Sequence, residues 1–156
     1  MAGYNSKKKI VHRTETPSGN VICAEHNPIA FRAEYPSWNF ATCDTCLWPF
    51  SMNAVGDVFW TEILPFLQSL ETMTWQEILN RSNNNHHLIK TNTLNKIARD
   101  RLYELHVEAE AVMSLRITGT HRLYGYLEGA VFHLLWFDTN HGDNDTCVCR
   151  SRKKHT

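Results

Sequence analysis

Residues 111–137 read AVMSLRITGTHRLYGYLEGAVFHLLWF, and this stretch decides the fold. From Ala111 onward, the pattern of side chains repeats every two residues, so that neighbouring side chains would lie on opposite faces of a β-strand. The pairs Gly119-Thr120 and Glu128-Gly129 interrupt this period and are typical of tight turns. The sequence therefore predicts a three-stranded antiparallel meander over 111–118, 122–127 and 131–137.

The last of these strands is apolar on both of its faces. Strict alternation places His133 with Val131, Leu135 and Phe137, and it places Phe132, Leu134 and Trp136 opposite them. A strand with two apolar faces suits the interior of a sheet that is covered by helices. We therefore expect this strand to have neighbours on both sides.

A helix is predicted before the meander, between Asp57 and Leu70. Its apolar residues follow a helical stripe that begins at Phe59, and Asp57 is placed to cap its first turn. Pro65 lies inside the stripe, so the helix should be kinked or divided into two pieces.

Two further helices follow. Thr74 and Glu77 have the spacing of a capping box, which predicts a short helix ending near Leu79. An amphipathic helix is predicted to start near Thr93. In that helix we expect Arg101 to pack its stem beside the apolar face while its charged head stays in solvent.

The N-terminal half is richer in strand-forming residues than in helix-forming ones. The runs 21–35 and 38–52 are aromatic and β-branched, and the prolines inside them favour edge positions or irregular ends. The whole chain is predicted to be α+β, an antiparallel sheet with a C-terminal three-stranded meander packed against two or three helices, plus an N-terminal strand-rich extension. The predicted organisation is a basic arm over 1–20, one domain over 21–145 and a basic tail over 146–156.

The net charge of zero conceals an uneven distribution. Residues 1–13 carry four basic side chains, residues 150–156 carry four more, and neither segment has an acid. Taking these eight from the sixteen basic residues leaves eight against sixteen acids in residues 14–149. Basic ends on an acidic body can contact nucleic acid, or they can be solvated ends that aid solubility.

The N-terminus indicates a cytoplasmic protein. Residues 1–13 are polar and basic with no apolar segment behind them, unlike a secretory signal. No run of apolar residues is long enough to span a membrane. Five cysteines in such a chain are better read as thiols or metal ligands than as disulfides.

The segments 114–126 and 131–141 resemble the core of the RelE/ParE-like toxin superfamily. Its pattern is a leucine-rich strand, a glycine, an arginine, a short strand, and an apolar strand that ends in a polar turn containing a histidine. The match covers 114–141 by sequence pattern and about 57–142 by the order of elements. The ending Trp136-Phe137-Asp138-x-Asn140-His141 is also similar to that of uncharacterised RelE-like proteins of bacterial mobile elements.

This resemblance implies a site on the meander. In the family, basic and polar side chains position the mRNA phosphate, activate the 2′-hydroxyl and protonate the leaving oxygen. The matching or nearby residues are Arg116, Arg122, Tyr124 and His141. Arginine can stabilise the charge of the transition state, and histidine or tyrosine can transfer protons.

These residues also have a structural interpretation. Arg122 and Tyr124 would then lie on a solvated strand face with cross-strand pairing. Asp138 and His141 would lie in a turn, with the aspartate accepting backbone N–H bonds.

Two functions follow from these observations. The first is a non-catalytic binding module on a RelE-like scaffold, which would bind an antitoxin-like protein or nucleic acid, because a scaffold does not determine function. The alternative is a metal-independent endoribonuclease, the toxin of a toxin–antitoxin pair, that cleaves mRNA. The motifs of P-loop proteins, dinucleotide-binding domains, HExxH proteases and α/β-hydrolases do not occur.

Four residues have the spacing of a structural zinc site. Cys23-x2-His26 and Cys43-x2-Cys46 could supply three thiolates and one imidazole. The alternative is that these cysteines are small buried hydrophobes, because they lie in apolar and aromatic runs. No other cofactor is predicted. Cys147-x-Cys149 is a further pair of thiols near the C-terminus.

Overall fold

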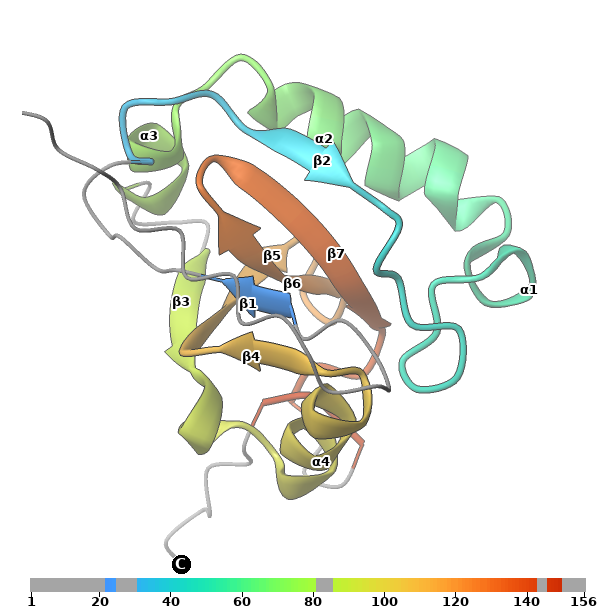
Figure 1. Ribbon diagram of the computed structural model, residues 1–156. Coiled ribbons are helices and arrows are strands. Elements are labelled where there is room, and N and C mark those ends of the chain that lie inside the picture. Colours follow the sequence, from blue (N-terminus) through green and yellow to red (C-terminus); the bar gives the residue numbers. More distant parts are fainter. Residues whose placement is uncertain (1–21, 25–30, 81–85, 143–145, 150–156) are drawn as a thin grey trace, which may run out of the picture.

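The computed structural model describes residues 22–24, 31–80, 86–142 and 146–149 (Figure 1). A mixed five-stranded sheet forms its centre, in the order β2 (Ser37–Asn39), β7 (Val131–Asp138), β6 (Arg122–Glu128), β5 (Ala111–Arg116) and β3 (His87–Lys90). All neighbours are antiparallel except β2 and β7, which run parallel. The predicted α+β class and the meander, β5–β6–β7, are therefore confirmed.

The N-terminal part supplies only short strands. β2 comes from the run 38–52 and lies beside β7 in Figure 1, so the last strand of the meander has neighbours on both sides as predicted. β1 (Ile22–Ala24) pairs in parallel with β4 (Val107–Ala109) in a separate two-stranded sheet. The predicted arm, residues 1–20, lies outside the described residues.

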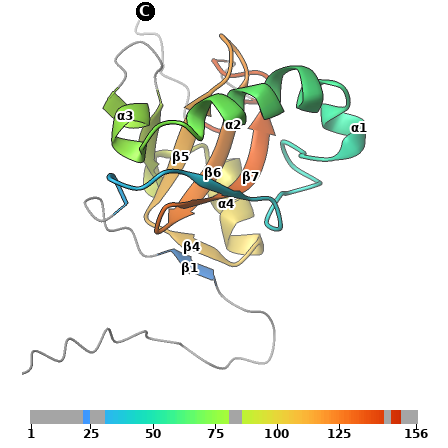
Figure 2. The same cartoon turned by 90° about the horizontal axis from the view of Figure 1, so that it is seen from above.

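Three helices and a π-helical turn cover one face of the large sheet. They are α1 (Met52–Val55), the π-helix η1 (Phe59–Ile63), α2 (Leu64–Leu70) and α3 (Trp75–Asn80). Their buried side chains form one core with Met113, Leu115, Leu123, Phe132 and Leu134 of the meander. Figure 2 shows α2 lying across these strands.

The first predicted helix continues without a break but changes from π-helical to α-helical form at Leu64, and its predicted cap is wrong. Pro65 is the second residue of the α-helical part, immediately after the π-helical turn. The N-cap of η1 is Val58, which makes no side-chain cap. Asp57 contributes its backbone carbonyl instead, accepting from the N–H groups of Trp60 and Thr61 at 3.0 Å each.

The opposite face of the sheet is covered by α4 (Lys96–Glu104), which follows the 3-10 turn η2 (Thr91–Thr93). Asn95 caps α4 by accepting the N–H of Ile97 at 3.0 Å. A second core joins Leu94, Ala98 and Leu102 to Tyr124, Trp136 and Val148. Val148 belongs to the predicted tail, so the folded part of the chain continues beyond residue 145.

The expectation for Arg101 is wrong, because its charged head lies at a buried carboxylate. Its Nε and Nη2 donate to Asp44 at 2.7 and 2.9 Å, and the Asp44 side chain is 1% exposed. The ion pair connects α4 to the loop that follows β2.

A β-bulge in β7 changes which side chains face each core. The register shifts by one residue after Tyr124, and Leu135 is the extra residue. Leu135 and Trp136 consequently both lie in the core under α4, while Phe137 joins Leu134 in the core under α1–α3. The strict alternation predicted for this strand is therefore wrong for Trp136 and Phe137.

In the part of the chain that the structure describes, each helix is too short or too polar to cross a lipid bilayer.

Candidate functional site

The four residues that the sequence indicated come together at one end of the meander. Arg116 of β5 lies opposite Arg122 of β6, and Arg122 lies opposite Asp138 of β7. Tyr124 is two residues further along β6, on the same face as Arg122. His141 follows β7, and its Nδ1 lies 3.3 Å from the Tyr124 hydroxyl oxygen.

Two of these side chains are in the interior. Arg122 is 5% exposed and Tyr124 is fully buried, so the prediction of a solvated strand face is wrong. The strand face is instead covered by α4 and by the segment around Val148. Arg116 and His141 are only half-buried, so they are the members of the group that solvent reaches.

Backbone carbonyls hold the two arginines. Arg122 Nη1 donates to the carbonyls of Thr118 and His121, the second at 3.0 Å, and Arg116 Nε donates to Thr118 at 3.3 Å. In the described part of the chain, neither guanidinium forms an ion pair with an acid. Burial, and next the charge of Arg116, lowers the pKa of Arg122 from its ordinary value.

Asp138 has a structural role in the turn after β7. Its carboxylate accepts the N–H groups of Asn140 at 2.8 Å and Val148 at 3.0 Å, in the manner expected from the sequence. Burial raises the pKa of Asp138, and the two backbone hydrogen bonds oppose that rise. This carboxylate therefore attaches the returning C-terminal segment to the sheet.

His141 lies in a positively charged neighbourhood. Burial, and then the charge of Arg122, lowers the pKa of His141 below its ordinary value of 6.5; Asp138 opposes this, and His87 and Arg116 add to it. The imidazole is therefore mainly neutral at pH 7. A neutral imidazole has one nitrogen that accepts a proton.

The C-terminal thiols belong to the same neighbourhood, which sequence reasoning missed. The backbone of Cys149 forms an isolated antiparallel β-bridge with that of Leu94. The Cys149 sulfur lies 3.5 Å from His141 Nδ1 and 3.0 Å from the Cys147 sulfur. The Cys-x-Cys spacing was visible in the sequence. Nothing local indicated that the chain returns to the end of β7.

The predicted zinc ligands are not brought together within the described residues. Cys43 and Cys46 lie on a loop around Asp44 and not on a strand: Cys43 packs against the core under α1–α3, and Cys46 is exposed. Burial raises the pKa of Cys43 to about 12, as for a small buried hydrophobe. His26 and the Cys23 side chain lie outside what the structure describes, so the zinc site stays a prediction.

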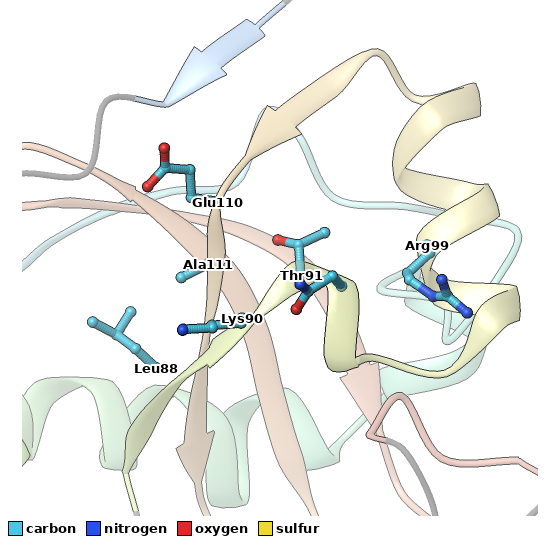
Figure 3. A pocket seen from close by; sticks show the side chains of 7 residues that line it. Leu88, Lys90, Thr91, Arg99, Glu110 and Ala111 are labelled. Atoms are coloured by element: carbon cyan, nitrogen blue, oxygen red, sulfur yellow. The ribbon is translucent and has the colours of Figure 1, made fainter.

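A separate pocket lies at the other end of β3 and β5 (Figure 3). Its lining comes from β3, η2, α4 and the start of β5, and consists of Leu88, Lys90, Thr91, Asn92, Arg99, Glu110 and Ala111. The charged ends of Lys90, Arg99 and Glu110 point in different directions in Figure 3. A binding pocket needs a few convergent polar groups, so this one is a weaker candidate than the site at His141.

Comparison of this chain with protein-family models, with curated proteins and with solved structures found no match. The RelE-like resemblance of residues 114–141 therefore stays a prediction.

Proposed function

We propose that this protein is a nucleic-acid-binding module whose ligand is single-stranded RNA, bound at the surface around Arg116 and His141. The observation that carries the proposal is the direct cross-strand pairing of two arginines, Arg116 and Arg122, neither of which forms an ion pair with an acid in the described residues; Asp138, opposite Arg122, opposes the excess positive charge only in part. Like charges that face each other across strands are destabilising. A bound phosphate would offset that cost, and arginine suits phosphate through its planar set of donors.

The two arginines have different roles in the proposed site. Arg122 is interior and held by carbonyl groups, so it contributes a fixed charge and not a direct contact. Arg116 is half-buried, and its own backbone N–H is fixed by a 2.9 Å hydrogen bond to His86 Nδ1. Arg116 is therefore the arginine that a phosphate can reach.

The basic C-terminal residues support the same surface. Arg150, Arg152, Lys153 and Lys154 directly follow Cys149, whose sulfur lies 3.5 Å from His141 Nδ1. The chain thus continues from a residue of this site into a segment with four positive charges. Neutralisation of phosphates by such residues supplies a binding term that depends strongly on salt. The preference for RNA over DNA rests on the RelE-like pattern of residues 114–141.

The test is a titration of a fluorescein-labelled single-stranded 20-mer RNA, followed by anisotropy at low salt, with the same sequence as DNA in parallel. Arg116→Gln is expected to weaken RNA binding several-fold, because one charged phosphate contact is lost. Arg99→Gln removes the same charge from the exposed surface of α4 and should leave the affinity within about twofold. Equal effects of the two variants, or no binding by the wild type, would overturn the proposal.

One observation favours a second candidate, a metal-independent endoribonuclease. His141 is half-buried, mainly neutral at pH 7 and close to Arg116, which are the properties of a general base beside a phosphate-binding group. The burial of Arg122 and Tyr124 leaves His141 and Arg116 as the groups that could reach RNA.

Cleavage is measured on the same 20-mer by gel electrophoresis, with and without ribosomes. Wild-type protein should cut the RNA, His141→Gln should not, and an RNA with 2′-deoxy sugars should stay intact because it lacks the nucleophile. Binding without cleavage would leave the binding module alone, whereas cleavage that persists in His141→Gln would exclude this residue as the base.

A further inference from the structure

Two cysteines meet beside the histidine at the C-terminal end of the described chain. Cys147 and Cys149 flank Val148, which is buried and whose backbone N–H and carbonyl groups both form hydrogen bonds. The Val148 N–H donates to Asp138 at 3.0 Å, and its carbonyl accepts the N–H of Asn95 at 3.1 Å. The chain bends at Cys147 and Val148, and this bend beside the anchored valine brings the two thiols together.

The two sulfur atoms are already in contact. They lie 3.0 Å apart, and the Cys147 thiol also donates to the Cys149 carbonyl at 3.0 Å. A disulfide bond is roughly 2.05 Å long, so bond formation needs an approach of only about 1 Å.

The environments of the two thiols differ. Cys147 is 1% exposed, and burial, followed by its hydrogen bond with Cys149, raises the pKa of Cys147 to about 12. Cys149 is half-buried and lies 3.5 Å from His141 Nδ1, which can accept its proton. A small oxidant in solution can therefore reach Cys149, while Cys147 is protected from it.

We propose that Cys149 and Cys147 form a redox-active dithiol that exchanges with small aliphatic disulfides, with Cys149 as the attacking thiol and Cys147 as the resolving thiol. This activity goes beyond nucleic-acid binding and does not depend on it. It uses the half-buried sulfur, the interior sulfur and the adjacent imidazole as one unit.

The exchange proceeds in two balanced steps. Cys149 passes its proton to His141 Nδ1, and its sulfur attacks the small disulfide RSSR; a Cys149–SR bond forms, the S–S bond breaks, and one RS⁻ leaves. Cys147 then loses its proton to the first RS⁻ as its sulfur attacks the Cys149 sulfur, which forms the Cys147–Cys149 bond and releases the second RS⁻; that thiolate takes the proton held by His141. The protons of the two cysteines finish on two RSH molecules. The dithiol is oxidised by two electrons, and RSSR is reduced.

Cys46 provides a comparison within the same chain. It is exposed, and among the described residues its sulfur contacts neither another thiol nor a histidine. A small disulfide should therefore add to Cys46 and remain there. Trypsin separates the two cases, because cleavage after arginine gives a peptide 33–81 with Cys43 and Cys46 and a peptide 123–150 with Cys147 and Cys149.

The experiment treats the full chain, reduced and freed from reductant, with glutathione disulfide at neutral pH, followed by acid quenching and peptide mass spectrometry. Peptide 123–150 should lose two hydrogen atoms and carry no glutathione, while peptide 33–81 should gain a glutathione adduct. In Cys147→Ser, Cys149 should hold glutathione as a stable mixed disulfide. In Cys149→Ser, Cys147 should stay reduced until the protein is unfolded in urea.

His141 is tested by rate. His141→Gln should slow the first reaction of peptide 123–150 several-fold and leave the rate at Cys46 unchanged. The proposal is overturned if wild-type Cys149 keeps its glutathione, or if peptide 123–150 stays reduced after Cys46 has reacted. Equal rates at Cys149 in wild type and His141→Gln would remove the histidine from the mechanism. All readouts are made without RNA, so failure of the binding proposal would not affect them.

Discussion

At the scale of single residues, Asp44 contacts several separate parts of the fold, and no sequence pattern around it indicates these contacts. Its carboxylate accepts from Arg101, from Trp136 Nε1 at 3.1 Å and from the N–H of Cys46 at 2.9 Å. Its backbone N–H donates to Leu135 at 2.8 Å. A loop, a helix and the bulge of β7 therefore depend on one buried side chain.

Removal of this carboxylate should be among the most destabilising single substitutions in the protein. Asp44→Ala leaves the Trp136 N–H without its acceptor and removes the buried partner of Arg101, which keeps only the exposed Glu104 at 2.8 Å. The substitution is expected to lower the free energy of unfolding by about 3–5 kcal/mol. Asp100→Ala, which breaks the exposed ion pair with Lys96, should cost less than about 1 kcal/mol. Urea denaturation followed by circular dichroism measures both, and similar losses would contradict the role assigned to Asp44.

The same residue predicts a dependence on pH. Burial alone would raise the pKa of Asp44, but hydrogen bonds from Arg101, Cys46 and Trp136 outweigh it and lower the value from 3.8 to about 2. The folded state thus holds the charged form more strongly than the unfolded state does. The stabilisation is fully present above about pH 4 and is lost as the pH falls towards 2. The difference in unfolding free energy between wild type and Asp44→Asn should narrow over that interval and stay constant between pH 5 and 7.

At the scale of elements, the capping box before α3 forms as the sequence indicates. Glu77 Oε2 accepts the Thr74 N–H at 2.7 Å, and the Thr74 hydroxyl oxygen accepts the Glu77 N–H at 3.3 Å. Two backbone N–H groups at the start of the helix are thereby satisfied by side chains three residues away. Such a contact is local, which explains why sequence alone could predict it.

Thr74→Ala should destabilise the protein by about 1 kcal/mol, because the helix loses its capping oxygen. Thr74→Ser keeps that oxygen and should stay within about 0.5 kcal/mol of wild type. Thermal unfolding of the three proteins side by side gives the comparison. An equal loss in both variants would point to the methyl group of Thr74 and not to the cap.

The bulge between β6 and β7 depends on a glycine. A Cβ at Gly125 would lie 2.2 Å from the His133 carbonyl oxygen and 2.8 Å from the Phe132 ring, whereas a Cβ at Gly119 would meet nothing within 4 Å. Gly125→Ala is therefore expected to cost about 3 kcal/mol or more, because backbone must move. Gly119→Ala is the matched control and should change stability by less than about 1 kcal/mol. A tolerated Gly125→Ala would contradict the close approach of the two strands.

At the scale of the whole molecule, the sequence carries basic residues at both ends of an acidic body, and the C-terminal ones follow directly on Cys149. Residues 150–156 follow Cys149 directly, and they carry the same number of lysines and arginines as residues 1–13. Deleting one segment or the other removes the same charge. The comparison therefore separates an effect of total charge from an effect of the charge that follows Cys149.

Deletion of residues 150–156 should weaken RNA binding and reduce its dependence on salt. Each phosphate contact that is lost lowers the slope of log affinity against log salt by about 0.7 for a single strand. Deletion of residues 1–13 removes an equal charge and should have the smaller effect. Anisotropy titrations between 50 and 200 mM salt, about the range over which such contacts are lost, give the slopes. Equal losses from the two deletions would indicate a non-specific charge effect.

Local patterns in the sequence were sufficient for the meander and for the cap at Thr74, because each depends on contacts between residues close along the chain. Alternation alone could not indicate the bulge at Leu135, since the extra residue is required by packing between the two cores. The same limit applies to Arg101, whose partner Asp44 is distant in sequence.

For the candidate site, the sequence by itself determined which types of side chain are present: two arginines, a tyrosine and a histidine on one short meander. Only the tertiary structure decided that Arg122 and Tyr124 are interior, that Arg116 and His141 reach solvent, and that two thiols join them. The physical reason is that burial depends on what covers the strand face. Here that cover is α4 and the segment around Val148, which are brought in by contacts that no local pattern records.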